Sequence, residues 1–343
     1  MYCSTLNKLP TPSFEKTGWP WTEQTKYLDD FLDSSDFPRI SIITPSYNQG
    51  QFIEETIRSV LLQGYPNVEY IIIDGGSTDN TIEVIKRYEP WIAYWVSEAD
   101  RGQTHAINKG LERATGEILA YLNSDDYYLP GTLHAVAEHF RNHPEIDLLH
   151  GRCCYVNTQG EPIGEQFASI HTFEEIIDLW GVWWQKRQFV QPEIFWTKRI
   201  SDRIDSFNES LYFVMDYEYW CRILLAGGTV GTIDCLLTCF RFTDTQKSNQ
   251  SNKVAEELLK VVQPWLWNSL TPISWRKRLS LQGHWLYQAI LLKQIEQSVA
   301  KGDHKLLRCL KSAITVLQNP QILLIPGFHS RASQYFSRLL SIH

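Results

Sequence analysis

A regular alternation of short apolar runs with amphipathic stretches is the feature that most constrains this chain. The predicted strands are residues 40–44, 68–73, 93–96 and 117–122, and the predicted helices are residues 51–62, 80–88, 104–114 and 131–141. Strands that alternate with helices form a parallel sheet covered by helices on both faces. These strands are almost continuously apolar, as expected when both faces of a sheet are buried. We therefore predict an α/β fold with a mostly parallel central sheet flanked by helices.

The regular alternation occupies only part of the chain, so we predict three regions. They are an N-terminal arm at 1–37, an α/β domain at 38–245 with halves 38–146 and 147–245, and a mainly helical, basic C-terminal extension at 253–343. The arm is rich in proline, with a short helix predicted near 24–32. We expect Trp19 and Trp21 to hold the arm against the domain.

The charge distribution is uneven along the chain. The net charge is −7, yet the residues from Trp275 onward hold ten Lys and Arg against two acids, a net of +8. An acidic body makes nucleic acid an unsuitable partner, whereas a basic tail favours docking to an anionic partner, with a solvated helical face as the alternative. Segments 275–279 and 306–311 mix basic with apolar residues, which is typical of helices that lie on a membrane surface. Packing on the body or a dimer interface is the other interpretation of these segments.

The N-terminal residues do not resemble a signal peptide, and no apolar run is long enough to cross a bilayer. The seven cysteines show no zinc-ligand spacing, and reduced thiols fit them best. We therefore expect a cytoplasmic location, with peripheral attachment to the cytoplasmic membrane face as a hypothesis.

Carboxylates follow the predicted strands at the points where these strands end. They are Asp74, Glu98, Asp100, Asp125 and Asp126. Ligands of open parallel sheets bind outside the carboxyl ends of the strands, and crowded carboxylates repel one another unless a cation offsets them. Oxygen ligands favour Mg²⁺ or Mn²⁺ over zinc, and Mg²⁺ is usually shared with substrate phosphates. Since the chain has neither glycine-rich phosphate-loop signature, we expect a metal to offset most of the phosphate charge.

Four motifs in this region occur in an order and at a spacing known from one family. They are Thr44–Asn48, Ile73–Thr81, Asp100–Gly102 with Asn108–Gly110, and Leu122–Asp126. The chain resembles family 2 glycosyltransferases, whose nucleotide-binding fold is called GT-A, over roughly residues 39–242. The resemblance implies a GT-A-like fold for the α/β domain, with the donor nucleotide in its first half and the acceptor in its second.

The resemblance also implies roles for individual residues on the donor side. The base and ribose of the donor would contact Thr44, Pro45, Tyr47 and Asp74, with Asp100 near the base. Asp125 resembles the carboxylate that faces the ribose and sugar, and Asp126 resembles the one that binds the metal bridging the diphosphate. Because Asn123 stands where relatives often carry aspartate, the choice of Asp125 or Asp126 as the main metal ligand stays open.

The remaining implied roles lie in the second half of the domain. Asp216, in the stretch 215–222, falls on the position of the family's catalytic base, and Glu218 is the rival base. A carboxylate there would take the proton of the acceptor hydroxyl, and direct displacement would invert the anomeric carbon. Gln191, Glu193 and Glu218 fall on the acceptor side.

Many relatives carry a histidine after the last strand of the sheet, where this chain reads Phe240-Arg241-Phe242-Thr243. Either the metal relies on fewer protein ligands, or Arg241 contributes to binding the diphosphate.

The sequence thus predicts an inverting, Mn²⁺- or Mg²⁺-dependent transferase. It would move sugar from a nucleotide-diphosphate sugar, expected to be a UDP-sugar, to a hydroxyl of a glycan or a lipid-linked acceptor. The first alternative is a catalytically inactive nucleotide-sugar or carbohydrate-binding module. A nucleotidyltransferase is the second, and it is disfavoured because Thr44–Gly50 contains no basic residue.

Overall fold

The computed structural model describes residues 5–12, 16–25, 37–243, 246–247 and 250–325. The chain forms two compact units, of which the first comprises Met1–Thr172 and Gln185–Asn249 and the second comprises Phe173–Trp184 and Gln250–His343. Segment 173–184, which the sequence assigns to the acceptor half, therefore groups with the C-terminal helices. Most of the helix predicted near 24–32 lies outside the described residues.

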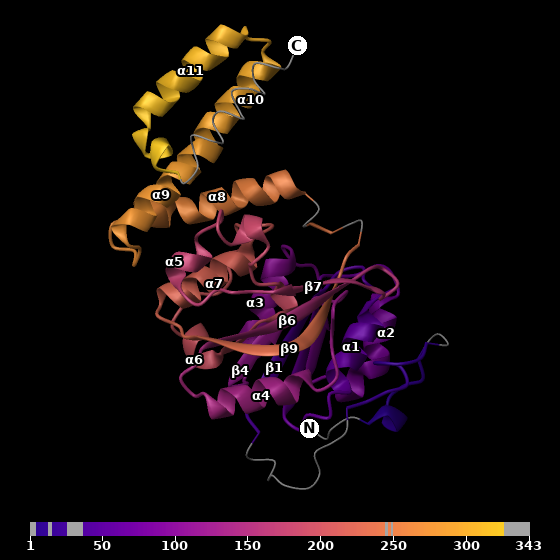
Figure 1. Ribbon diagram of the computed structural model, residues 1–343. Coiled ribbons are helices and arrows are strands. Elements are labelled where there is room, and N and C mark those ends of the chain that lie inside the picture. Colours follow the sequence, from indigo (N-terminus) through magenta and orange to yellow (C-terminus); the bar gives the residue numbers. More distant parts are fainter. Residues whose placement is uncertain (1–4, 13–15, 26–36, 244–245, 248–249, 326–343) are drawn as a thin grey trace. The chain divides into compact units, whose positions relative to one another are not determined.

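The first unit is built on one sheet of nine strands within the described residues (Figure 1). The strands are β1 (Ile40–Ser46), β2 (Val68–Asp74), β3 (Tyr94–Ser97), β4 (Ile118–Tyr121), β5 (Tyr127–Tyr128), β6 (Leu148–Val156), β7 (Pro162–Phe167), β8 (Phe195–Thr197) and β9 (Val230–Arg241). Their order is β3-β2-β1-β4-β8-β6-β9-β5, with β7 paired to β6. Strands β1, β2, β3, β4, β6 and β9 run in one direction, while β5, β7 and β8 run against them. The sheet is therefore mostly parallel, as predicted.

Helices follow the strands of the first half in the predicted alternation. The helices of this unit are α1 (Ile53–Leu61), α2 (Thr81–Tyr88), α3 (Gln103–Arg113), α4 (Thr132–Asn142), α6 (Lys198–Ser201) and α7 (Met215–Leu225), with short 3-10 turns η1 (Leu6–Lys8), η3 (Glu89–Trp91) and η5 (Gln191–Glu193). Helix α3 lies directly against β1, since a Cβ atom on Gly110 would come within 2.4 Å of the Ile43 side chain. The sequence did not predict β5 and β7, because β5 has two residues and β7 is mostly exposed.

The described part of the N-terminal arm is held by a buried arginine of α1. The guanidinium of Arg58 donates hydrogen bonds to the backbone carbonyls of Pro10, Pro20 and Trp21. The indole of Trp19 donates to the carbonyl of Tyr128 at 2.8 Å, and Trp21 is buried. Both tryptophans hold the arm, as expected from the sequence.

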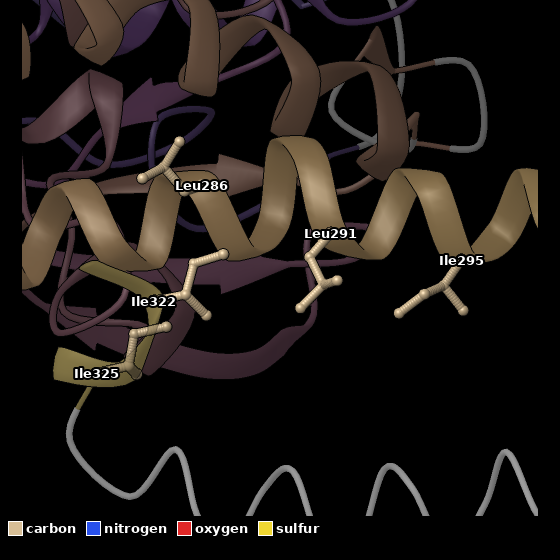
Figure 2. Packing of buried hydrophobic residues seen from close by; sticks show 5 residues of the cluster. All are labelled: Leu286, Leu291, Ile295, Ile322 and Ile325. Atoms are coloured by element: carbon tan, nitrogen blue, oxygen red, sulfur yellow. The ribbon is translucent and has the colours of Figure 1, made fainter. Parts of the chain in front are cut away.

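The second unit is helical throughout most of its described length. Its elements are α5 (Phe173–Ile176), η4 (Trp183–Gln185, at the boundary), α8 (Ser251–Trp267), α9 (Trp275–Leu286), the π-helical η7 (Tyr287–Leu292), α10 (Lys293–Ala300), α11 (Lys305–Gln318) and η8 (Pro320–Leu324). Figure 2 shows part of its core, in which Ile322 and Ile325 lie beside the helical run that carries Leu286, Leu291 and Ile295. Gly283 allows this approach, because a Cβ atom there would lie 2.3 Å from the carbonyl oxygen of Gln321.

Two of the cations in segment 275–279 serve the fold of the second unit. Arg278 donates to the carbonyls of Leu266, Asn268 and Thr271 and so satisfies the carboxyl end of α8. Lys277 forms an ion pair with Asp178 at 2.5 Å. Lys277 and Arg278 therefore take part in the packing of this unit. Among the described helices, none has the length and apolar character needed to cross a bilayer.

Candidate active site

The carboxyl ends of β2 and β3 are joined through the side chain of Asp74. This buried carboxylate accepts hydrogen bonds from the backbone and hydroxyl of Ser77, from the backbone of Gly76 and from the hydroxyl of Ser97. The carboxylate of Asp100 lies against the same turn. A Cβ atom on Gly75 would be 2.7 Å from its Oδ2. The structure thus brings Asp74 and Asp100 to one edge of the sheet, with Asp74 shaping the turn.

The end of β1 presents one aromatic side chain at this edge. Tyr47 is 61% exposed, whereas Thr44 and Pro45 are buried within the strand. The hydroxyl of Thr44 lies 3.1 Å from the phenol oxygen of Tyr70, inside the domain. Of the three residues predicted here, Tyr47 alone has a side chain that a ligand could reach without rearrangement.

The two acids of the turn after β4 differ in their surroundings. Asp126 is 1% exposed, and its Oδ1 accepts a hydrogen bond from the backbone N–H of Arg241 at 2.9 Å. Burial raises the pKa of Asp126 well above its usual range, and the neighbouring Asp125 adds to this effect. Asp125 is partly exposed, although burial also raises its pKa. The turn therefore keeps Asp126 inside and leaves Asp125 accessible.

Arg241, at the end of β9, braces this turn from within. Its guanidinium donates to the carbonyl of Asp125 at 3.0 Å and pairs with Glu55 of α1 at 2.9 Å. It also donates to the carbonyls of Asn157 and Thr158. Because Arg241 is 1% exposed and bonded on all sides, the structure does not support a role for it at the diphosphate. Of the two explanations for the missing histidine after the last strand, the one in which the metal relies on fewer protein ligands remains.

Asn123 sits at the centre of a hydrogen-bonded chain across the same edge. Its Oδ1 accepts from Gln103 at 2.7 Å, and its Nδ2 donates to Gln191 at 2.9 Å. Gln191 in turn donates to the carbonyl of Tyr121, which fixes its amide orientation. An aspartate at position 123 could accept from Gln103 but could not donate to Gln191. The amide, unexpected from the family pattern, therefore matches its neighbours.

Lys247 extends this chain, and sequence reasoning missed both it and Gln103. Its Nζ lies 3.3 Å from Oε1 of Gln103 and 4.1 Å from the centre of the Tyr212 ring. The sequence offers one lysine within the polar stretch 243–252, and nothing in that pattern indicates which edge of the sheet it reaches. The structure thus adds a cation near Asn123.

The first turn of α7 carries the two candidate bases. Asp216 is partly exposed and accepts a hydrogen bond from the N–H of Tyr217 at 2.7 Å. It lies close to Tyr121 at the end of β4, where burial raises the pKa of the phenol and the carboxylates of Asp216 and Asp126 raise it further. Glu218 is instead held in a two-point ion pair by Arg222, at 2.8 and 3.0 Å. The ion pair with Arg222 makes Glu218 the weaker candidate for the base.

Two motif residues position the loop that leads into α7. The side-chain amide of Asn108 exchanges two hydrogen bonds of 2.9 Å with the backbone of Phe207. Arg101 forms an ion pair with Glu209 at 2.7 Å. These contacts tie α3 and the end of β3 to the segment that precedes Asp216.

Glu193 lies beneath the edge, on the 3-10 turn η5. It is fully buried, and its Oε1 accepts from the N–H of Val190 at 3.0 Å. Within the described part of the chain its Oε2 has no hydrogen-bond partner, and burial raises its pKa well above the usual range. The acceptor-side role of Glu193 stays a prediction, and the structure places its carboxyl group inside the protein.

The site is distinct from the hollow of about 520 Å³ at the opposite edge of the sheet. That hollow is lined by Thr115, Glu117, Arg141, Lys198 and Arg199, near the amino ends of β1 and β4. None of the residues predicted to bind donor or acceptor lines it. We therefore take the carboxyl edge as the candidate active site.

The family model of glycosyl transferase family 2 matches residues 41–208. The α/β domain of the chain belongs to this family. Its domain shares 32% identity over 144 residues with an uncharacterized glycosyltransferase, alr2836, of Nostoc sp., which covers 38% of this chain and 45% of that protein. It is 28% identical over 236 residues to the Escherichia coli UDP-Glc:alpha-D-GlcNAc-diphosphoundecaprenol beta-1,3-glucosyltransferase WfgD, covering 67% of this chain and 83% of WfgD. The chain spans less than half the length of the first curated relatives that it matches.

Solved structures confirm the GT-A fold of the family 2 chain. TarS from S. aureus in complex with UDP-GlcNAc aligns with a TM-score of 0.56 at 15% identity, covering 85% of this chain and 92% of that one. The mannosyltransferase PcManGT from Pyrobaculum calidifontis, in complex with GDP-Man and Mn²⁺, aligns with a TM-score of 0.55 at 18% identity, covering 92% and 88%. The predicted GT-A-like sheet with a helical C-terminal region is therefore correct.

Proposed function

We propose that this family 2 chain is an inverting glycosyltransferase that moves a sugar from a nucleotide-diphosphate sugar to a hydroxyl group. One observation carries the proposal. In a domain that matches family 2, Asn123 and Asp125 lie in the turn after β4, and Asp216 lies close enough to Tyr121, at the end of β4, for its carboxylate to raise the pKa of that phenol. The related structures bind UDP-GlcNAc or GDP-Man, and we choose a UDP-sugar as the first donor to test.

The donor would lie along the ends of β1, β2 and β3. Tyr47 would stack on the base, because its side chain is exposed at the end of β1. Asp100 borders the same turn and would contact the base side. Thr44 and Pro45 would support this surface from within the strand. Asp125 would face the ribose and the sugar, since it is the accessible acid of the turn after β4.

The oxygen ligands at this edge fit a divalent metal ion that is held by few protein side chains. No cluster of three or more His, Cys, Asp or Glu suited to a metal occurs among the described residues. One accessible carboxylate together with substrate phosphates is a usual environment for Mg²⁺. We propose that Asp125, rather than the buried Asp126, would hold Mn²⁺ or Mg²⁺. When bound, such an ion offsets the negative charge of the diphosphate.

Lys247 supplies a second positive charge on this edge. It reaches Gln103, which bonds to Asn123 beside Asp125. We propose that the ammonium group contacts the diphosphate and stabilises it as a leaving group, because a fixed cation beside a departing phosphate lowers the energy of the transition state.

Asp216 would act as the general base. As the acceptor oxygen attacks the anomeric carbon, its proton passes to the carboxylate of Asp216, and the bond from that carbon to the diphosphate breaks. Attack from the face opposite the leaving group inverts the anomeric configuration. Gln191 and Glu218 would hold neighbouring parts of the site in place, since each is bonded within the protein.

The proposed class of acceptor is based on WfgD, which matches a larger part of this chain than alr2836 does. The name of WfgD specifies a sugar linked to diphosphoundecaprenol as its acceptor. We propose a glycan or a lipid-linked saccharide as the acceptor of this chain, and a working location at the cytoplasmic face of a membrane.

A donor panel tests the proposal. Purified protein is incubated with UDP-Glc, UDP-GlcNAc, UDP-Gal and GDP-Man, with saccharide and lipid-diphosphate acceptors, in Mn²⁺ or Mg²⁺, and nucleoside diphosphate release is measured with and without chelator. We expect one donor to be consumed and the chelator to slow its use. Nucleotide-sugar binding without turnover across the panel would instead support the inactive binding module.

A further inference from the structure

Helix α11 of the second unit buries polar residues and exposes apolar ones, which is the reverse of the usual arrangement. Its buried residues are Ser312, at 3% exposure, and Thr315, at 6%. Leu306 and Leu317, by contrast, are 76% and 80% exposed. A helix that packs only on its own domain turns its apolar side inward, so α11 has the pattern expected of a helix with a further partner.

The exposed apolar residues form one continuous stripe. Leu306, Leu310, Ile314 and Leu317, here called the α11 stripe, follow one another at intervals of four, four and three residues. Residues at these intervals lie on the same face of a helix. Leu310 and Ile314 are also exposed, at 58% and 45%. The stripe therefore runs along most of the helix.

The core of the second unit does not use this stripe. Its buried cluster is formed by Leu286, Leu291, Ile295, Ile322 and Ile325. Helix α11 contributes Val316 to that cluster, from outside the stripe. The four stripe residues thus add exposed apolar area without adding to this core, which is the usual mark of an interaction surface.

The charge of α11 indicates the nature of the partner. The helix contains Lys305, Arg308 and Lys311 and no acidic residue. The nearby Asp303 is already paired with Lys311, at 2.5 Å. The residues from Trp275 onward carry a net charge of +8. Two copies meeting through this region would bring like charges together, whereas an anionic lipid surface would attract them.

We propose that the α11 stripe inserts into the interface of an anionic membrane, which attracts the net positive charge of the C-terminal region. Amphipathic helices with basic polar sides bind such surfaces by burying their apolar face at the boundary of headgroups and acyl chains. The inference assigns the membrane contact to α11 because its four stripe residues are exposed and lie outside the core cluster. In segment 275–279, Lys277 and Arg278 contact their own unit. The inference does not depend on the proposed reaction.

Vesicle co-sedimentation of the full chain tests this inference. Wild type, the double variant Leu310→Glu with Leu317→Glu, and the control Leu270→Glu are mixed with phosphatidylcholine vesicles, with or without phosphatidylglycerol. Leu270 is a matched control because it is 88% exposed in the same unit but lies outside α11. We expect wild type and the control to bind anionic vesicles, and the double variant to bind about tenfold less. Equal thermal unfolding midpoints would show that the substitutions leave the fold intact.

Two outcomes would overturn the inference. The first is equal binding of wild type and the double variant, which includes the case in which neither binds. The second is a wild-type dimer in light scattering that becomes monomeric in the double variant without any change in vesicle binding, which would make the stripe an interface between copies. Turnover of donor with a water-soluble acceptor is measured in parallel. It distinguishes failure of the membrane contact from failure of the proposed activity.

Discussion

The turn after β4 and the first turn of α7 each contain two acids, and in each pair the two carboxylates have different contacts. Asp126 is buried against the backbone of Arg241, while Asp125 stays partly exposed. Glu218 is paired with Arg222, while Asp216 lies near the end of β4. The backbone N–H of Arg241 holds Asp126, whereas the guanidinium of Arg222 holds Glu218. This difference teaches that neighbouring carboxylates with the same chemistry are separated into supporting and accessible groups by their tertiary contacts.

The contrast in α7 predicts the largest effect. Asp216→Asn should lower kcat by about 10³-fold, because removal of a general base costs 10²- to 10⁴-fold, while donor affinity stays within about twofold. The matched Glu218→Gln change weakens the pair with Arg222 but leaves the proposed base in place, so we expect a much smaller loss of kcat. Steady-state kinetics and nucleotide titration measure both. Similar losses of kcat in the two variants would remove the distinction between these acids.

The contrast in the turn after β4 predicts an intermediate effect. Asp125→Asn should lower kcat/KM by about 10²-fold and weaken Mn²⁺-dependent nucleotide binding, because it removes the accessible carboxylate. Asp126→Asn should instead lower the free energy of unfolding by about 1–3 kcal/mol, since an amide at this buried position would set its N–H groups against the Asn123 donor.

Calorimetric nucleotide titration with and without Mn²⁺, together with urea unfolding, separates the two variants of this turn. If Asp126→Asn abolished the metal response while Asp125→Asn preserved it, the assignment of the metal ligand would be reversed.

The smallest predicted effect concerns Lys247, the cation that reaches Gln103 and the Tyr212 ring. Lys247→Ala should raise KM for the donor and lower kcat, for a combined loss of about tenfold, because one charge-assisted contact to the diphosphate is removed. The matched control is Lys253→Ala, an exposed lysine on α8. It should leave both constants unchanged. Competition by UDP and by uridine measures the contact directly, since only the diphosphate should lose affinity in Lys247→Ala.

Much of the first half of the fold could be predicted because its signals are local. The apolar runs and amphipathic stretches from Arg39 to Arg141 specify β1 to β4 and the helices between them. Strand β5 could not be predicted, because its two residues pair with β9, which lies far along the chain. The motifs likewise indicate which edge of the sheet carries the polar groups, since strand ends of a parallel sheet share an edge.

The sequence by itself determined the α/β alternation, the family motifs and the basic C-terminal region. Only the tertiary structure decided which acids are accessible, since Arg241 reaches Asp126 from the end of β9. It also decided that Asn123 joins Gln103 to Gln191, and that the apolar side of α11 faces outward. The physical reason is the range of the interactions: periodicity and motifs are set by neighbours in the chain, whereas burial and hydrogen-bond pairing depend on residues brought together from distant segments.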